Sequence, residues 1–457
     1  MMTPREDQEA SISHLLKCLK ADRYAVDGSD CGIGKTLVAT EVAKRTRTPV
    51  TVVCPKAAMP GWFRHGESQD AEMNILNWEM VRTGRSSLGK WLPSGDPRRL
   101  DEFEWNKDKV KFLAFDEIHR AMSYRSKNGA MVRAAKRQNI PAMGLSATLA
   151  DTPLELDSVG YMLGLHDGQN PKATLRKPCP VSFFDWVSAR SCEFDSFNGG
   201  WTFNGTDAHR QAVMKQIHHD IYPRHGVRVR TKDLGDAFPE TQVFAERYSL
   251  GDEARVNALY ERMREPLELL AKAKETDVPG HVLTGLLRDR QEVELLKAPV
   301  MADLARDYER QGYSVAMFVN FRATLEWICE DLNSNCFIDG SQIGPGGAAQ
   351  RELNRQDFQS DQEHYITAIG GAGGIGIDLH DIHGIRPRVS LISPGFNAKE
   401  LLQILGRVHR AGGLSKSLQR VICAAGTVEE GVYRAFNAKV NCLDTLNDGD
   451  LIPRFAK

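Results

Sequence analysis

The sequence predicts an α/β protein built from two parallel β-sheets. Short β-branched and apolar runs alternate with helical patterns up to residue 165 and again after residue 297, as in parallel strands joined by crossover helices. A glycine-containing loop lies between a strand and a helix near the start of the chain, a typical phosphate-binding arrangement. A chain of 457 residues suggests two or three domains. We therefore predict one lobe over residues 1–165, a second over 297–457, and an inserted, mainly helical region over 166–296.

The composition is that of a soluble globular protein, with 41% hydrophobic and 26% charged residues. Because the net charge is −1, a nucleic-acid partner would have to be held by a local basic groove. No stretch approaches the roughly 20 apolar residues of a membrane-spanning helix, so we expect no membrane partner. The nine cysteines include no C-x-x-C pair, which indicates reduced thiols, no zinc site, and a cytoplasmic setting, or a nuclear one if the source is eukaryotic.

The stretch Ser29–Thr36 has the order expected of a phosphate-binding loop. It follows the apolar residues Tyr24–Val26 and precedes a helical pattern. Gly32 and Gly34 let the backbone turn tightly, so that several N–H groups can point at one phosphate chain. The positive N-terminal end of the following helix would add to this attraction. The loop therefore predicts a nucleotide site, and the plainer alternative is a glycine-bearing turn before an ordinary helix.

Two side chains at the end of this loop have specific expected roles. Lys35 can reach the β- and γ-phosphates, and the hydroxyl of Thr36 can bind Mg²⁺. Ser29 departs from the full pattern G-x-x-x-x-G-K-[ST], which has glycine at that place. Gln8 lies earlier, in a helical pattern over residues 7–20, and is a candidate for reading an adenine edge, although most helical glutamines are simply solvated.

An acidic pair follows the predicted strand Val110–Phe115. Asp116 can hold Mg²⁺, directly or through water, and Glu117 can accept a proton from the attacking water. His119 is placed to couple the nucleotide site to the rest of the protein. An acidic pair at a strand end is common, but after a phosphate loop at this distance it favours ATP hydrolysis.

The second half carries two further segments with candidate functions. A glycine-rich stretch, Gly370–Asp378, follows a predicted strand and ends in Gly376 and Asp378. It allows either close approach to a ligand or a flexible hinge, and Asp378 can reach a ribose hydroxyl or hold an arginine. In a later helical pattern, the spacing of Gln403, Arg407 and Arg410 lets them share one helix face. They suit the charge that builds on a γ-phosphate, and the alternative is a basic face making salt bridges.

The middle region is rich in aromatic residues between Phe183 and Phe203, and two interpretations remain open. A packed hydrophobic subdomain is favoured over an exposed wedge that stacks on unpaired bases. A basic run, from Arg224 to Lys232, suits either phosphate contact or a solvated face.

These motifs, in this order, resemble those of superfamily 2 helicases. Asp30–Thr36, Asp116–His119 and Ser146–Thr148 look like motifs I, II and III, and the segments ending at Asp378 and Arg410 look like motifs V and VI. The surroundings are similar to the Swi/Snf-like branch in its compact viral or prokaryotic form. Ala147 and Gly413 depart from that branch, which usually has glycine and glutamine at these places.

The resemblance implies two RecA-like lobes with ATP and Mg²⁺ in a cleft between them. Gln8 then falls on the adenine-reading position, and Gln403, Arg407 and Arg410 on positions that contact nucleotide from the second lobe. The implied activity is that of a DNA-dependent ATPase that moves on DNA and unwinds or remodels forks and junctions. DNA is favoured over RNA by resemblance only. A duplex translocase that displaces proteins and an ATP-gated clamp are the alternatives.

Overall fold

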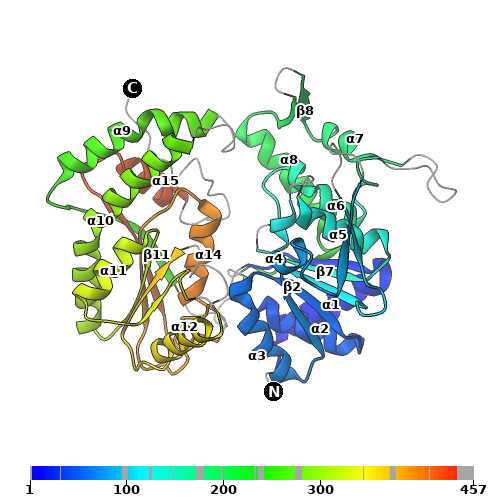
Figure 1. The fold of residues 1–457 in the computed structure, drawn as a ribbon, viewed down its shortest axis with the longest axis horizontal. Helices are drawn as coiled ribbons and strands as arrows, with labels where there is room; N and C mark the ends of the chain where they lie inside the picture. The colour runs from blue at the N-terminus through cyan, green and yellow to red at the C-terminus, as the bar shows by residue number, and fades with distance from the viewer. Residues whose placement is uncertain are drawn as a thin grey trace. The chain divides into compact units, whose positions relative to one another are not determined.

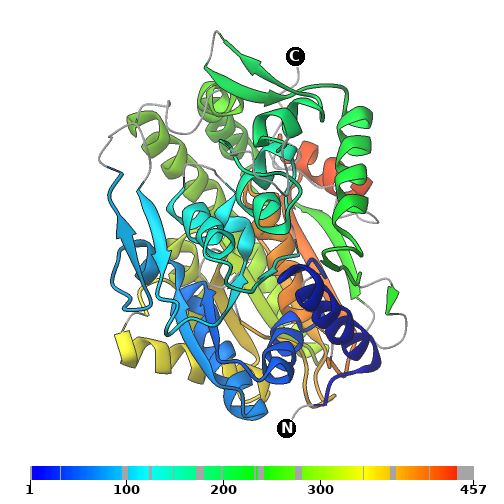
Figure 2. The ribbon, with the colours of Figure 1, turned by 90° about the vertical axis from the view of Figure 1, so that its right-hand side faces the viewer.

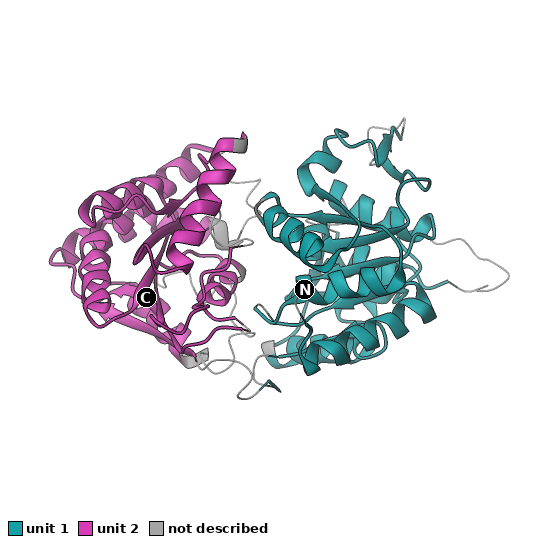
Figure 3. Ribbon diagram, turned by 90° about the horizontal axis from the view of Figure 1, so that it is seen from below, with its two compact units in different colours: residues 1–234 teal, residues 235–457 magenta. Residues whose placement is uncertain are grey.

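The computed structural model divides into two compact units, residues 1–234 and 235–457 (Figure 3). The predicted boundaries at 165 and 296 differ from this division, because residues 166–234 lie in the first unit and 235–296 in the second. The structure describes residues 3–30, 32–94, 101–122, 126–147, 149–170, 180–196, 199–230, 233–234, 241–272, 280–342, 344–370, 377–410 and 412–439.

Unit 1 is built on a six-stranded sheet in which all the pairings are parallel (Figure 1). Its strands in spatial order are β10 (Gly226–Val227), β1 (Tyr24–Asp27), β7 (Ala142–Leu145), β6 (Phe112–Asp116), β2 (Val50–Cys54) and β3 (Met73–Asn77). Two antiparallel pairs are separate from this sheet: β4 (Gly89–Leu92) with β5 (Glu102–Trp105), and β8 (Cys192–Asp195) with β9 (Gly200–Phe203).

Helices cover both faces of this sheet. They are α1 (Glu6–Asp22), α2 (Lys35–Thr46), α3 (Met59–Gln69), α4 (Trp78–Arg82), α5 (Lys127–Arg137), α6 (Asp157–Leu163), α7 (Phe183–Ser188) and α8 (Asp207–Ile221). Helix α1, in dark blue, runs beside β10 and α2 (Figures 1 and 2).

The buried strand β6 shows why the sheet needs cover on both sides. Leu113 and Phe115 pack into a core that includes residues of α5 and α6, while Phe112 and Ala114 pack with residues of α1, α2 and α3. Successive side chains of a strand point to opposite faces, so a continuous apolar run is the expected sequence of a strand buried on both.

Unit 2 repeats this plan with a second six-stranded sheet whose pairings are all parallel. Its spatial order is β11 (Thr241–Tyr248), β16 (Ser417–Ala424), β15 (Arg388–Ile392), β12 (Ser314–Val319), β14 (Tyr365–Ile369) and β13 (Phe337–Ile338). Its helices are α9 (Glu253–Lys272), α10 (Gly280–Arg310), α11 (Arg322–Asp331), α12 (Gly344–Gln359), α14 (Ala398–Val408) and α15 (Glu430–Lys439). The predicted two-sheet α/β fold is thus confirmed.

The aromatic middle region is largely packed into unit 1. Phe183 and Trp186 are buried in the core, and Phe184 stacks on Trp201 with ring centroids 5.4 Å apart. Phe194, on the β8–β9 hairpin, is 54% exposed, and this hairpin extends away from the sheet in both views (Figures 1 and 2). The packing interpretation therefore holds for the buried pair, while Phe194 keeps an open face. Among the described residues, no helix is long and apolar enough to span a bilayer.

Candidate nucleotide site

The register of the first sheet aligns the ends of three strands. Asp27 of β1 and Asp116 of β6 both pair with Leu145 of the intervening β7. The segments that follow these strands, Gly28–Gly34, Glu117–His119 and the one beginning at Ser146, therefore start at the same sheet edge. This carboxyl edge is where open α/β sheets bind ligands.

The phosphate loop has the predicted order of strand, loop and helix, with α2 beginning at Lys35. Gly32 and Gly34 have φ values of 83° and 97°, a left-handed region that glycine adopts without strain. A Cβ atom at Gly34 would also lie 2.5 Å from Nε2 of Gln8. Both glycines are thus required by conformation, and Gly34 by space as well. Cys31 lies outside the described residues.

The ammonium group of Lys35 lies inside its own loop. Its Nζ donates to the carbonyl oxygens of Ser29 at 2.7 Å and of Asp30 at 3.0 Å. Beneath it, the buried carboxylate of Asp27 accepts a hydrogen bond from the Ser29 N–H at 2.9 Å. Burial raises the pKa of Asp27, and the Lys35 charge and the Ser29 bonds oppose that shift. Asp27 was not predicted from the sequence, where its one signal is an acidic residue that ends a buried strand before the loop.

Gln8 supports the loop directly. Its Nε2 donates to the carbonyl oxygen of Ile33 at 2.9 Å, and its Oε1 accepts from the N–H of Arg5 at 3.0 Å. The side chain is only 2% exposed. Both ends of the amide thus bind the protein, and the adenine-reading role of Gln8 stays a prediction.

The acidic pair is held by a set of directed N–H groups. Asp116 accepts from Trp62 Nε1 at Oδ2, 2.8 Å away, and from the N–H of Glu117 at Oδ1, 3.0 Å away. A second indole, that of Trp78, donates to the carbonyl oxygen of Asp116 at 3.0 Å. Burial, followed by the negative charge of Glu117, raises the pKa of Asp116 to about 6, while the Trp62 bond and Lys35 act to lower it.

Glu117 has a left-handed backbone, with φ and ψ both 52°, which is unusual for a residue with a side chain. Its Oε2 lies 3.1 Å from Nδ1 of His119, and the same ring nitrogen lies 2.9 Å from the hydroxyl of Ser146. His119 thus connects the acidic pair to the segment after β7. The next motif residue, Thr148, lies outside the described residues.

In unit 2 the structure gathers three of the predicted residues. Arg410 forms an ion pair with Asp378, and Arg407 is buried with its Nη1 donating to the carbonyl oxygen of Ile377 at 3.4 Å. Burial alone would raise the pKa of Asp378, but Arg410, His380 and Arg407 together hold it below its ordinary value. Gly376 lies outside the described residues.

One part of the helix-face prediction is wrong. Gln403 and Arg407 lie one turn apart on α14, but this helix ends at Val408, so Arg410 lies in the segment after it. The guanidinium of Arg410 nevertheless reaches the same loop as Arg407, because it turns back to Asp378 and donates from Nε to the carbonyl oxygen of Gly406 at 3.2 Å.

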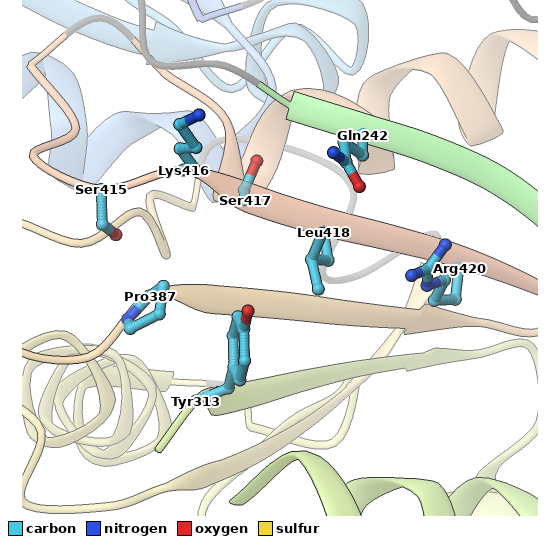
Figure 4. Close-up of a pocket in the computed structure, with 8 residues that line it drawn as sticks. All are labelled: Gln242, Tyr313, Pro387, Ser415, Lys416, Ser417, Leu418 and Arg420. Carbon is cyan, nitrogen blue, oxygen red and sulfur yellow. The ribbon is translucent and has the colours of Figure 1, made fainter. Parts of the chain in front are cut away.

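A pocket of about 500 Å³ in unit 2 is separate from these residues (Figure 4). It is lined by Gln242, Tyr313, Pro387, Ser415, Lys416, Ser417, Leu418 and Arg420. Most of these lie at or before the starts of β11, β12, β15 and β16. This is the edge of the sheet opposite to the one at which parallel α/β sheets bind nucleotides, so it is not a candidate for the ATP site.

Residues of unit 1 also suit a magnesium ion accompanying a bound triphosphate. Mg²⁺ is usually held by one or two carboxylates together with phosphate oxygens. Asp116 provides a carboxylate at the loop edge, and Thr36 provides a hydroxyl in the first turn of α2. The donor set is hard oxygen throughout, as Mg²⁺ prefers.

The fold and this site define a class, that of α/β proteins that bind a nucleoside triphosphate on a glycine-containing loop beside an acidic pair. No family model matches the chain. Over 462 aligned residues it is 29% identical to a protein of Acanthamoeba polyphaga mimivirus named "Putative ATP-dependent RNA helicase", covering 97% of this chain and 83% of that protein.

Two solved structures are also similar. One is a Sulfolobus solfataricus SWI2/SNF2 ATPase core in complex with double-stranded DNA, at 15% identity, a TM-score of 0.38, and coverage of 98% and 94% of the two chains. The other is a Pyrococcus furiosus Hef helicase domain, at 16% identity, a TM-score of 0.42, and coverage of 94% and 98%.

The near full-length similarity to a helicase-family protein, with the motifs in order on two parallel-sheet units, supports the prediction of a superfamily 2 helicase or translocase. Such proteins are ATP-hydrolysing enzymes.

Proposed function

We propose that this chain is an ATPase that moves on DNA and unwinds or remodels branched structures such as forks and junctions. The observation that supports this most strongly is the convergence of Lys35 and Asp116 at one sheet edge. The charge of Lys35 acts on the carboxylate of Asp116, and Glu117 is adjacent to it. This is the combination that phosphoryl transfer to water needs.

In the proposed reaction each side chain has one task. Lys35 exchanges its bonds to the loop carbonyls for bonds to phosphate oxygens. Thr36 and Asp116 would hold Mg²⁺, which when bound would neutralise charge on the phosphates. Glu117 accepts the proton of the attacking water, and the neighbouring His119 keeps its carboxylate in place.

The second unit is proposed to act on the same nucleotide. Arg407 and Arg410 are planar cations suited to the charge that develops on the γ-phosphate, and Gln403 precedes them by one helical turn. Hydrolysis would then depend on closure of the two units, which is how a cycle of binding and hydrolysis becomes movement along a phosphate backbone. Contacts to phosphates carry little sequence information, so we propose structure-selective and sequence-tolerant binding.

The class of nucleic acid is part of the proposal. The motif resemblance favours DNA, whereas the name of the mimivirus relative keeps RNA open. ATPase stimulation measured with single-stranded, duplex, forked and four-way DNA, and with RNA, decides between them. Strongest stimulation by RNA would contradict the DNA assignment. Strong stimulation by DNA without strand displacement on a fork would favour a duplex translocase that displaces bound proteins.

Replacing Glu117 by Gln tests the motor against an ATP-gated clamp. We expect Glu117→Gln to retain ATP binding but to lose about 10²–10⁴-fold in hydrolysis, the range attributed to a general base. Glu104→Gln is the matched control, since this strand carboxylate is 45% exposed and pairs with Lys90. If Glu117→Gln kept full strand-displacement or remodelling activity without hydrolysis, the motor assignment would be wrong and the clamp favoured.

A cytoplasmic location is proposed on the basis of cysteine chemistry. Cys18, Cys54, Cys192, Cys329, Cys336 and Cys423 are free thiols in the part of the chain that the structure describes. Free buried thiols suit a reducing compartment.

A further inference from the structure

Ser29, which stands where the phosphate-loop pattern has glycine, has a partner outside the loop. Its hydroxyl oxygen accepts a hydrogen bond from the N–H of Val229 at 3.0 Å, across 200 residues of sequence. The side chain is only 2% exposed. The departure from glycine therefore has a structural consequence, because glycine has no hydroxyl to offer this N–H group.

Val229 belongs to a segment that runs parallel to β1 and the start of the phosphate loop and accepts hydrogen bonds from them at every second residue. We call residues 225–230 the exit segment, since unit 1 ends shortly after it, at Leu234. Its carbonyl oxygens at His225, Val227 and Val229 accept from the N–H groups of Val26 at 2.9 Å, Gly28 at 2.8 Å and Asp30 at 3.0 Å. A parallel ladder thus continues beyond β1 into the first half of the phosphate loop.

The hydroxyl of Ser29 takes the place of one backbone acceptor in this ladder. In a regular parallel pair, the N–H of Val229 would donate to a backbone carbonyl of the facing strand. Here the acceptor is the Ser29 side chain, while the carbonyl oxygen of Ser29 accepts from Lys35 Nζ at 2.7 Å. One residue therefore contacts both the exit segment and the lysine expected to bind phosphate.

The packing leaves no room between the two backbones. A Cβ atom on Gly226 would lie 1.9 Å from the carbonyl oxygen of Val26, and one on Gly28 would lie 1.8 Å from the hydroxyl of Tyr222. Close-packed interiors transmit displacements because they compress little. A shift of the loop at Ser29 is thus passed to the exit segment.

We propose that Ser29 couples nucleotide occupancy of the phosphate loop to the exit segment, through which the chain leaves unit 1. The inference rests on the proposed function, since it requires that the loop binds nucleotide. Phosphate binding draws Lys35 away from the Ser29 carbonyl, while the hydroxyl keeps Val229 attached to the moving loop. Ser29 is a positioning residue in this scheme and not a catalytic one.

Hydrogen exchange in the full-length chain tests the coupling. Peptides covering residues 225–234 are followed with and without Mg²⁺ and ATPγS, in wild type, Ser29→Ala and Ser29→Gly. We expect nucleotide to change exchange of this segment in wild type, and the change to fall by about threefold to tenfold in both variants, as suits loss of one hydrogen bond. Ser126→Ala is the matched control, because the Ser126 hydroxyl also accepts from a backbone N–H, that of Gly129 at 3.0 Å, in a different part of unit 1.

Binding of a fluorescent ATP analogue is measured in parallel on the same proteins. An analogue that binds wild type without changing exchange at residues 225–234 overturns the coupling and leaves the proposed function standing. The coupling is likewise overturned, and the proposed function left standing, if Ser29→Ala raises exchange equally with and without nucleotide. A hydrogen bond with a purely structural role would behave in this way. Failure of wild type to bind the analogue overturns both.

Discussion

At the scale of single residues, Asp116 is held in one orientation by two tryptophans from different helices. Trp62 of α3 donates to the carboxylate, and Trp78 of α4 donates to the backbone carbonyl of the same residue. Both indoles are about 1% exposed, so neither bond competes with bulk water. The hydrogen bond from Trp62 therefore stabilises the charged form of the Asp116 carboxylate and acts to lower its pKa.

We predict that Trp62→Phe shifts the acidic limb of the ATPase pH profile to higher pH. The pKa of Asp116 is already raised to about 6, so activity that needs the carboxylate falls as pH drops through that value. Removing a bond to the charged form raises the pKa further, by about one unit if the bond contributes about 1.5 kcal/mol. Trp78→Phe is the control, because it removes only the bond to the carbonyl. Equal shifts in the two variants would contradict this role of Trp62.

The sequence predicted the residues that belong to a local motif. It did not predict the contacts between residues that lie far apart in the chain. Lys35, Asp116 and Glu117 could be placed because a strand end fixes where the next residues lie. The bond from Trp62 to Asp116 joins residues 54 apart, and no local pattern reports it. Arg410 was placed on a helix face because the spacing fits, yet α14 ends two residues earlier.

At the scale of elements, a buried ion pair joins the long helix α10 to the turn before α15. Lys297 Nζ lies 2.6 Å from Glu429 Oε1, and both side chains are 3% exposed. Glu429 also accepts from the hydroxyl of Tyr260 on α9 and from the N–H of Ala424 at the end of β16. Four elements of unit 2 thus meet at one carboxylate.

We predict that Lys297→Met destabilises unit 2 by about 3–5 kcal/mol, the cost of leaving a buried charge without its partner. Adding Glu429→Leu should recover part of this loss, since the uncompensated charge is then removed. Arg255→Ala, which breaks an exposed pair with Glu292, should cost about 1 kcal/mol or less. Urea unfolding monitored by hydrogen exchange of the β16 amides measures the stability of unit 2 separately from that of unit 1. A loss in Lys297→Met no greater than in Arg255→Ala would show that the pair has little energetic weight.

Periodicity and composition predicted the central strands of both sheets and the edge strand β13, and missed β10 and β11 at other sheet edges. The apolar runs that alternate with helical patterns before residue 165 and after residue 297 correspond to strands of the two sheets, among them β1, β6, β12 and β14. β11 was missed because its apolar run, Val243–Ala245, is only three residues long and lies at a sheet edge, inside a stretch expected to be an insertion. β10 has two residues, one of them Gly226, so no apolar run marks it in the sequence. The division between units fell at residue 234 because these two edge strands join different sheets.

At the scale of the whole molecule, the two units carry different parts of the chemistry. Unit 1 has the phosphate loop and the acidic pair, and unit 2 has the cluster of Asp378, Arg407 and Arg410. Asp378 pairs with Arg410 and keeps a lowered pKa, so the carboxylate that orients Arg410 stays charged. This cluster fits the proposal that unit 2 supplies positive charge to the nucleotide.

We predict that Arg410→Lys lowers the kcat for ATP by about 10³-fold or more, as expected when an arginine finger loses its planar fork, with little change in KM. Lysine keeps a positive charge beside Asp378, so unit 2 should stay folded, which thermal unfolding verifies. Arg310→Lys is the control, because Arg310 is 70% exposed and pairs with Asp307 three residues away in its own helix. Steady-state ATPase assays with saturating nucleic acid measure both variants. A folded Arg410→Lys protein with an unchanged kcat would mean that ATP hydrolysis does not depend on the Arg410 guanidinium, and its proposed role at the γ-phosphate would be wrong.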